Sequence, residues 1–222
     1  MSRAAAAIVG RRVWLCDLDG TLVDSSPVHE AAFRAAITEI APGLLGSFTY
    51  DGNAGASTRQ VVAGLGADPA VMDRLVWRKQ RLYREYVDAG RVRLFPGARR
   101  LLECLTDRGR TAYLVSSGSR GSVERVLAAC GLAGWFRAAL TADDAPSAKP
   151  DPGFYLRACQ DWAVDPADAV AVEDSTHGVA SAVGAGLLTL QVHTDEPALG
   201  AVPVRDLDEI VSLLGTEAKI NG

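Results

Sequence analysis

The sequence predicts an α/β protein in which a Rossmann-like parallel sheet core carries an inserted all-helical cap domain. Short β-rich runs alternate with helix-like stretches over most of the chain, as in parallel sheets that have helices on both faces. One long segment after the first of these runs has helical patterns but no convincing buried strand. Polar residues follow the β-rich runs directly, at the edge where such sheets bind their ligands.

Five segments have the length and composition of buried strands, and most end in small or polar residues. They are 13–20, 111–119, 138–144, 169–178 and 187–195. The stretches around them that have helical patterns are 97–108, 120–130, 152–162 and 176–185. Because the carboxyl ends of parallel strands lie at one edge of a sheet, we expect the polar groups after them to converge on one crevice.

The insert contains three predicted helices, at 27–40, 57–66 and 69–90. It follows the first strand, so we expect it to lie over the carboxyl ends of the strands as a lid. The sequence thus predicts two domains: a catalytic core formed by 1–24 and 94–222, and a cap formed by 25–93.

Composition and charge narrow the possible functions. The 222 residues carry a net charge of −4, so we expect no nucleic-acid partner, because phosphate-backbone binding needs a basic surface. The four cysteines show neither paired nor metal-type spacing, which favours buried thiols in a reducing compartment. The apolar stretch near the amino terminus is too short for a signal peptide or a membrane span. We therefore expect a cytoplasmic protein with no membrane partner.

The run WLCDLDGTLVDSS, at positions 14–26, places acidic residues directly after the first strand. Asp17 and Asp19 are two residues apart, so an extended chain puts both carboxylates on the same side. Their repulsion suggests a hard divalent cation such as Mg²⁺, and Glu173 and Asp174, after a later strand, could share in binding it. One carboxylate could then attack a phosphoryl group.

Groups that suit a phosphate follow other strands. Ser116 offers a hydroxyl, Lys149 a cation, and Gly118 a stretch of backbone whose N–H groups could approach an anion. Each element alone more often has a structural role, such as a surface acidic pair, a loop, a helix entry or a helix cap. These sequence features occur in this order along the chain, at strand ends, and their combination favours one shared site.

Taken together, DLDGTLVDS, VSSGS, KPDP and VEDSTHG resemble the four motifs of the haloacid-dehalogenase-like hydrolase superfamily. The chain is similar to the branch of beta-phosphoglucomutases and phosphoglycolate phosphatases, which has a helical cap between the first and second motifs. The resemblance extends over 13–195 and thus over essentially the whole chain.

This resemblance implies a role for each matching residue. Asp17 would be the nucleophile that forms an aspartyl-phosphate, and Asp19 the general acid and base. Ser116 and Lys149 would hold the phosphate. The residues implied for Mg²⁺ are Asp17, Glu173, Asp174 and, through its backbone carbonyl, Asp19; those implied for the phosphate loops are Thr21, Ser117 and Gly118.

The cap is expected to select the substrate. In this branch, His29 would couple cap closure to Asp19, and Lys79 would help to bind the phosphate or the sugar. Arg59 lies in a stretch similar to the substrate loop of sugar-phosphate members. His29 could instead be an exposed helix residue, and Lys79 part of a solvated basic face.

The spacing of three aromatic residues in the last cap helix, Trp77, Tyr83 and Tyr86, predicts that they form the core of the cap.

The leading hypothesis is a Mg²⁺-dependent phosphatase that acts on a small phosphorylated metabolite, above all a sugar phosphate, and is a monomer. One alternative is a phosphomutase of the beta-phosphoglucomutase type, in which a sugar hydroxyl replaces water. Another is a phosphonate hydrolase that uses Lys79 to form a Schiff base. A fourth is a catalytically silent binding module that keeps the fold.

Overall fold

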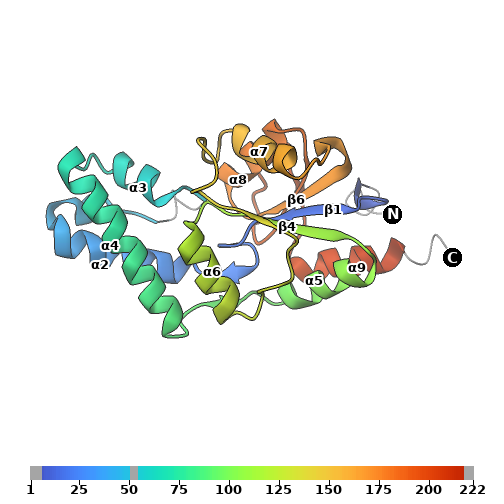
Figure 1. The fold of residues 1–222 in the computed structure, drawn as a ribbon, viewed down its shortest axis with the longest axis horizontal. Coiled ribbons are helices and arrows are strands. Elements are labelled where there is room, and N and C mark those ends of the chain that lie inside the picture. The colour runs from blue at the N-terminus through green and yellow to red at the C-terminus, as the bar shows by residue number, and fades with distance from the viewer. Residues whose placement is uncertain (1–6, 51–54, 218–222) are drawn as a thin grey trace.

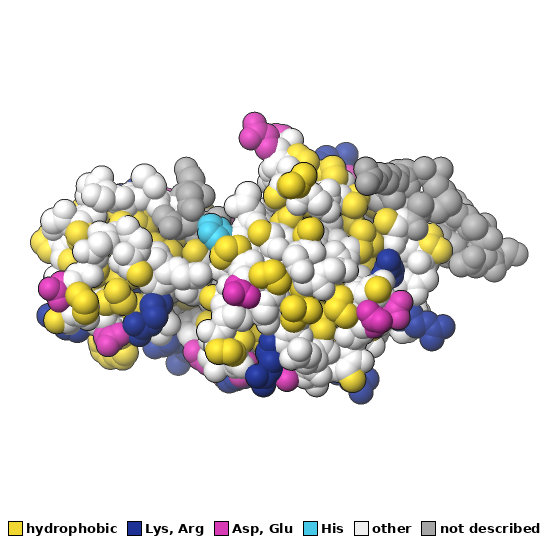
Figure 2. Space-filling model, turned by 90° about the horizontal axis from the view of Figure 1, so that it is seen from above, with side chains coloured by type: hydrophobic (Ala, Val, Ile, Leu, Met, Phe, Trp, Pro, Cys, Tyr) yellow, Lys and Arg dark blue, Asp and Glu magenta, His cyan; other side chains and the backbone are white. Residues whose placement is uncertain are grey.

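The computed structural model describes residues 7–50 and 55–217, which form a sheet-containing core and a smaller helical cap (Figure 1). The predicted domain ranges also take in 1–6, 51–54 and 218–222, which lie outside the described residues. Figure 2 shows acidic and basic side chains interspersed over one face of both parts. Within 7–50 and 55–217, no helix has both the length and the apolar character needed to cross a membrane.

The core is built on a six-stranded sheet whose neighbouring strands all run parallel. In sheet order the strands are β5 (Ala139–Leu140), β4 (Thr111–Val115), β1 (Val13–Cys16), β6 (Ala169–Glu173), β7 (Leu188–Gln191) and β8 (Val202–Pro203). The predicted α/β class is confirmed. The strand expected at 138–144 is much shorter than predicted, and β8 was not predicted at all because two residues leave no periodic signal.

Helices cover both faces of the sheet (Figure 1). They are α5 (Ala98–Asp107), α6 (Arg120–Ala129), α7 (Gly153–Asp161), α8 (Thr176–Gly184) and α9 (Leu207–Glu217). Alternate residues of β1 point to opposite faces, as a strand requires. Trp14 and Cys16 pack into the apolar cluster that contains α5 and α9, whereas Leu15 packs into the cluster that contains α7 and α8.

The cap is formed by α2 (Ser26–Ile40), the short 3₁₀ helix η1 (Pro42–Ser47), α3 (Thr58–Gly64) and α4 (Pro69–Asp88). Its three α-helices lie within the predicted ranges, apart from a start one residue earlier in α2. Helices α2 and α4 pack against each other through buried side chains such as Phe33, Ile37 and Leu75.

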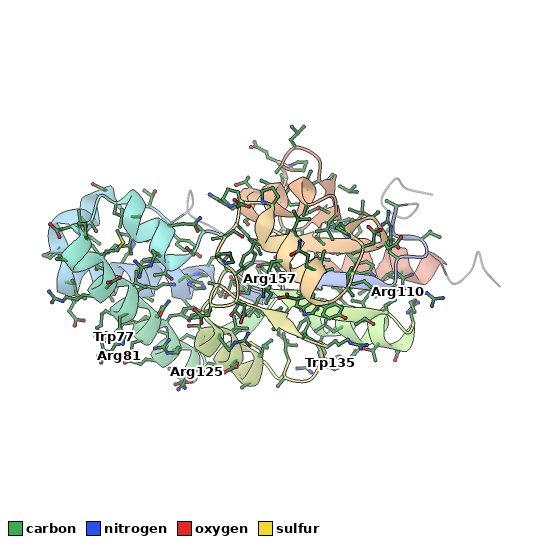
Figure 3. The ribbon with its side chains drawn as sticks, turned by 45° about the horizontal axis from the view of Figure 1, so that its top comes forward. Trp77, Arg81, Arg110, Arg125, Trp135 and Arg157 are labelled. Carbon is green, nitrogen blue, oxygen red and sulfur yellow. The ribbon has the colours of Figure 1, made fainter. Side chains whose placement is uncertain are left out.

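The prediction that Trp77 belongs to the cap core is wrong. Its side chain is 57% exposed and lies with Arg81 on the outer side of α4 (Figure 3). Tyr83 is 1% exposed and Tyr86 is partly buried, so the apolar stripe of α4 passes through these two residues and Lys79. Trp77 is two residues before Lys79, and two such positions on a helix face nearly opposite sides.

Two short strands join the core to the cap. Strand β2 (Val23–Asp24) leads into the cap, β3 (Arg93–Leu94) leads out of it, and the two pair antiparallel. The Phe95 N–H also donates to the Leu22 carbonyl, at 3.0 Å. The two crossings of the chain thus lie side by side, close to the boundaries predicted at 24–25 and 93–94.

Candidate active site

Asp17 follows the last residue of β1 and lies at the carboxyl edge of the sheet. Its backbone N–H donates to the Val172 carbonyl of β6 at 3.0 Å, which continues the ladder by one residue and fixes the direction of the side chain. The residue is 6% exposed. The Lys149 Nζ donates to Asp17 Oδ1 at 2.6 Å, so the candidate nucleophile is a buried carboxylate with a cation beside it.

Lys149 is 1% exposed and uses its three donors on three acceptors. Besides Asp17, its Nζ donates to Glu173 Oε1 at 2.6 Å and to the Val115 carbonyl at 3.0 Å. The Tyr155 hydroxyl donates to the same Glu173 oxygen at 2.7 Å. Burial lowers the pKa of Lys149, but the Asp17 and Glu173 carboxylates more than compensate, so the ammonium stays charged.

Three carboxylates meet at this edge. One oxygen each from Asp17, Glu173 and Asp174 lies within 4.8 Å of the other two. Burial raises the pKa of Glu173, and it raises the pKa of Asp174 to about 7, because a desolvated carboxylate resists ionisation. Lys149 is the one described cation that bonds to this cluster, so the cluster has an excess of negative charge.

Two glycines allow this crowding. Gly20 has φ of +91°, and a β-carbon there would collide with the Asp174 carboxylate. A β-carbon at Gly178 would collide with the carboxylate of Glu173, whose Oε2 is buried and has no hydrogen-bond partner in the described part of the chain. Oxygen donors, excess negative charge and a buried unpartnered oxygen are what a hard divalent cation requires, so these residues fit Mg²⁺.

Asp19 points away from the acidic cluster and towards the cap. The Tyr83 hydroxyl of α4 donates to Asp19 Oδ1 at 2.8 Å, and His29 Nε2 of α2 lies 3.2 Å from the same oxygen. Burial raises the pKa of Asp19, but His29 and these hydrogen bonds outweigh burial and hold it below its ordinary value. The side chain of Asp19 is thus held by cap residues, and its predicted metal contact, through the backbone carbonyl, stays a prediction.

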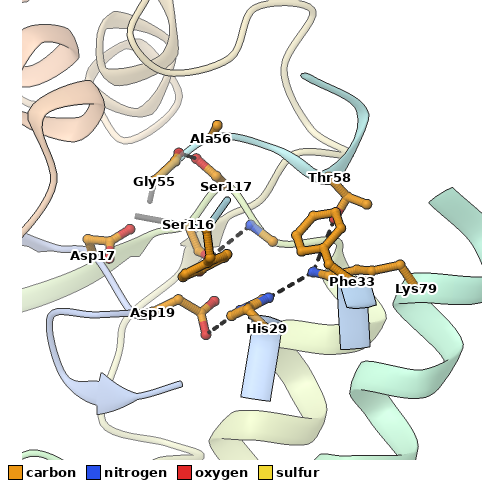
Figure 4. Close-up of a pocket in the computed structure, with 12 residues that line it drawn as sticks. Asp17, Asp19, His29, Phe33, Gly55, Ala56, Thr58, Lys79, Ser116 and Ser117 are labelled. Atoms are coloured by element: carbon orange, nitrogen blue, oxygen red, sulfur yellow. Dashed lines mark hydrogen bonds and ion pairs between the residues drawn. The ribbon is translucent and has the colours of Figure 1, made fainter. Parts of the chain in front are cut away.

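His29 and Lys79 form a buried pair behind Asp19 (Figure 4). The Lys79 Nζ lies 2.7 Å from His29 Nδ1 and 3.3 Å from Thr58 Oγ1. Burial lowers the pKa of Lys79 to about 7, and burial together with the nearby Lys79 lowers the pKa of His29. We therefore describe the pair as sharing one positive charge, which faces the Asp19 carboxylate.

The second motif lines the pocket with Ser116, Ser117 and Gly118 (Figure 4). Ser116 is 1% exposed, and its Oγ accepts from the Gly118 N–H at 3.0 Å. The Ser117 hydroxyl donates to the Gly55 carbonyl of the cap at 2.9 Å. The Gln60 side chain of α3 donates to the Lys149 carbonyl at 3.0 Å, so the cap touches the core at two further points.

Two predicted substrate residues lie outside this pocket. Arg59 is exposed on α3 and pairs with Asp73 at 2.7 Å. It lines a neighbouring polar groove between the cap and the core, not the pocket that contains Asp17. Thr21 is fully buried and donates to Asp174 Oδ1 at 3.0 Å, so it contacts the acidic cluster.

The sequence did not predict three residues of the site, Gln60, Thr58 and Tyr155. Only Tyr155 carried a usable signal: a tyrosine in an apolar helix face needs a partner for its hydroxyl, and Lys149 is six positions before it.

The family of the chain follows from a comparison with known families. Residues 12–186 match the haloacid dehalogenase-like hydrolase model. The chain therefore belongs to this family and is an enzyme of its phosphatase type, as its motifs predicted.

Named relatives support the same assignment. The chain is 33% identical over 194 residues to hexitol phosphatase A of Escherichia coli, with 85% of this chain and 87% of that protein covered. It is 30% identical over 207 residues to validoxylamine A 7'-phosphate phosphatase of Streptomyces hygroscopicus subsp. limoneus, with 90% and 95% covered. The crystal structure of CbbY from Rhodobacter sphaeroides in complex with phosphate has a TM-score of 0.77 and covers 92% of this chain and 99% of that one. At 23% identity, this likeness shows the shared fold.

The acidic cluster predicts how stability depends on pH in the absence of metal. We expect the free energy of unfolding to fall by at least about 1 kcal/mol between about pH 4 and pH 7. The pKa of Asp174 is raised from 3.8 to about 7, so the folded chain keeps a proton that the unfolded chain has lost. Raising the pH therefore favours unfolding in this range. The lowered pKa of His29 offsets part of this loss, because the unfolded imidazole takes up a proton in mild acid more readily than the folded one. Lys79 acts only above this range, because its pKa is lowered from 10.5 to about 7.

Urea denaturation in EDTA across this pH range measures the effect. Asp174→Asn should flatten the curve, and Mg²⁺ should stabilise the wild type more near neutral pH than in mild acid. A wild-type stability that rises steadily from about pH 4 to pH 7 would contradict the expected charge state of the cluster.

Proposed function

We propose that this enzyme is a Mg²⁺-dependent phosphatase that hydrolyses a small phosphorylated metabolite, above all a sugar or polyol phosphate, through an aspartyl-phosphate on Asp17. The observation that carries the proposal is the pair of carboxylates with different surroundings. Asp17 is held by Lys149 in the core, whereas Asp19 is held by Tyr83 and His29 of the cap. Two carboxylates with distinct environments suit a nucleophile and an acid or base.

The first half of the reaction needs a nucleophile and a proton donor. An oxygen of Asp17 attacks the phosphorus, the bond from phosphorus to the ester oxygen breaks, and Asp19 gives that oxygen a proton. Asp19 is ionised in the absence of substrate, since its pKa is low. A phosphate dianion in the pocket would raise that pKa, and the shared proton of His29 and Lys79 lies next to it.

The second half needs a base. Asp19 takes a proton from water, the water oxygen attacks the phosphorus, and the bond to Asp17 breaks to release inorganic phosphate. Lys149 compensates the charge of Asp17 in both halves, and Ser116 and Gly118 line the same pocket. We expect Asp17, Asp174 and Glu173, with the Asp19 carbonyl, to hold Mg²⁺. Its charge would favour the developing negative charge of the phosphoryl oxygens.

The substrate class rests on the covering of the pocket by the cap and on the relatives. Residues of α2 and α4 and the segment 55–58 cover the pocket, and this covering favours a small molecule over a macromolecule. Two relatives bear the names of a hexitol phosphatase and a phosphatase of validoxylamine A 7'-phosphate. We propose a small hydroxylated phosphate ester here as well, and a monomer as the working form.

Release of inorganic phosphate tests the proposal. We expect Mg²⁺-stimulated release, concentrated on one or a few members of a panel of hexose, pentose, triose and hexitol phosphates plus phosphoglycolate. The control is the same panel in EDTA. Release that is equal with and without Mg²⁺ would refute the metal role, and no release from any member would refute the substrate class.

A phosphomutase is the second candidate, and the contacts of Asp19 favour it. Asp19, the proposed acid and base, is held by cap residues. It is therefore placed for reaction when the cap is closed and bulk water is excluded. In a mutase, a sugar hydroxyl would take the place of water. Beta-glucose 1-phosphate that becomes glucose 6-phosphate with little phosphate release would support the mutase over the phosphatase.

A phosphonate hydrolase is favoured only by Lys79, whose lowered pKa of about 7 suits a nucleophilic amine. Its Nζ bonds to His29 and Thr58 and, among the described residues, to no acidic one. Borohydride reduction with a carbonyl-bearing phosphonate would attach the substrate to Lys79 if this chemistry occurs.

A further inference from the structure

Tyr155 is a buried tyrosine of α7 that contacts the Glu173 carboxylate from the face of the sheet that α7 and α8 cover. Its side chain is 0% exposed, in the apolar cluster formed with Leu15, Phe154 and Ala171. The hydroxyl donates to Glu173 Oε1 at 2.7 Å, and the Lys149 Nζ lies 5.3 Å from the centre of its ring. A polar group in such surroundings costs free energy unless it is bonded, so this hydrogen bond matters.

The hydrogen-bond donors around Glu173 show what the Tyr155 hydroxyl contributes. Lys149 has three protons and divides them between the Asp17 carboxylate, the Glu173 carboxylate and a backbone carbonyl. Glu173 Oε1 accepts from Lys149 and from Tyr155, while Glu173 Oε2 has no partner among the described residues. Tyr155 is therefore the one described donor to Glu173 that does not also serve the nucleophile.

The position does not need a hydroxyl for packing. The preceding residue, Phe154, is equally buried in the same cluster with a ring and no polar atom. A phenylalanine at 155 would fill nearly the same volume and would spare the chain a buried polar group. The hydroxyl is thus accounted for by its acceptor, the carboxylate of Glu173.

We propose that Tyr155 is a positioning residue that fixes the Glu173 carboxylate and thereby keeps Lys149 shared between Glu173 and Asp17. This inference rests on the proposed function, since Glu173 and Asp17 are also expected to hold Mg²⁺. Without the hydroxyl, Glu173 keeps Lys149 as its single described donor. Glu173 then turns more freely, and its charge draws the ammonium away from the nucleophile.

Tyr155→Phe tests this in the full-length protein, with Tyr113→Phe as the matched control. Tyr113 belongs to the same apolar cluster and is 7% exposed; its ring stacks on Trp162 at 4.3 Å, and its hydroxyl bonds to no described residue. Mg²⁺ affinity is measured by titration calorimetry, and kcat, KM and Tm are measured alongside. We expect Tyr155→Phe to lower Mg²⁺ affinity and kcat by about 10- to 100-fold, because such supporting residues typically have effects of this size. KM for the organic substrate should change little, since Tyr155 does not line the pocket.

Tyr113→Phe should leave Mg²⁺ affinity and kcat within about twofold of the wild type. If Tyr155→Phe has the same Mg²⁺ affinity and the same kcat as Tyr113→Phe, the proposal is overturned. A variant with 4-fluorophenylalanine at 155 refills the space of the hydroxyl without donating a hydrogen bond. Recovery of wild-type affinity and kcat in that variant would assign the effect to packing and would also overturn the proposal.

Combining the substitution with Glu173→Gln gives a second test. Because Tyr155 acts through Glu173, Tyr155→Phe should cost little further Mg²⁺ affinity in the Glu173→Gln background, and a full additional loss would refute the proposed route. The proposed function fails separately, if the wild type neither binds Mg²⁺ nor responds to it.

Discussion

Replacing Asp17 with asparagine is expected to reduce phosphate release by at least about 10³-fold while the fold stays intact. Asparagine keeps the volume of the side chain and an oxygen that can accept from Lys149, but it is a far weaker nucleophile. Lys149 keeps the Glu173 carboxylate as its counter-ion in this variant, so Tm should not fall by much.

Asp24→Asn is the matched control, because Asp24 belongs to the same motif but is exposed in β2 and lies outside the pocket. Turnover is measured for both variants with a substrate identified in the panel, and mass spectrometry follows the phosphorylated enzyme. Asp17→Asn should show no phosphorylated species, whereas Asp24→Asn should behave as the wild type does. Substantial turnover in Asp17→Asn would remove Asp17 from the role of nucleophile.

Lys149→Met should damage both stability and activity. Its removal leaves Asp17 and Glu173 buried without their shared cation, and breaking a buried ion pair in this way costs about 3–5 kcal/mol. Turnover should fall by about 10²- to 10³-fold, the usual effect of removing one charge-stabilising donor from an active site. Mg²⁺ should restore part of the lost stability, because it replaces some of the missing positive charge.

Lys79→Met offers a control for the stability effect, because Lys79 is also a buried lysine but its hydrogen-bond partners in the described structure, His29 and Thr58, carry no carboxylate. Its pKa of about 7 means that its charge is weakly held, so methionine should cost less there. Urea denaturation with and without Mg²⁺ compares the two variants. Equal losses of unfolding free energy would show that the ion pairs of Lys149 do not stabilise the fold.

The sequence predicted that several polar residues would lie close together, because each of them lies at the end of a strand; their catalytic roles stay predictions. Asp17, Ser116 and Glu173 directly follow or end strands that are adjacent in the sheet, so topology alone brings them together. Lys149 lies in a loop, but its spacing in a motif identified it.

Contacts that join distant parts of the chain were less predictable. Nothing in the spacing of α3 shows that Gln60 reaches the Lys149 carbonyl or that Arg59 faces Asp73, because both depend on the position of the cap over the core. The wrong prediction for Trp77 has a related cause. Aromatic residues usually lie in cores, but Trp77 is not among the residues of α4 that face α2. The short strands β2, β3 and β8 carry too few residues for any periodicity.

The antiparallel pair β2–β3 has a mechanical consequence. Because the chain enters and leaves the cap through two hydrogen-bonded strands, we expect the cap to move about the β2–β3 pair and not to twist freely as it would on two independent linkers. Asp19 stands only four positions before Val23, the first residue of this pair, and forms a bridge to it. A cap movement that admits a substrate would therefore also move Asp19, the proposed acid and base, so we expect substrate entry and proton transfer to be coupled.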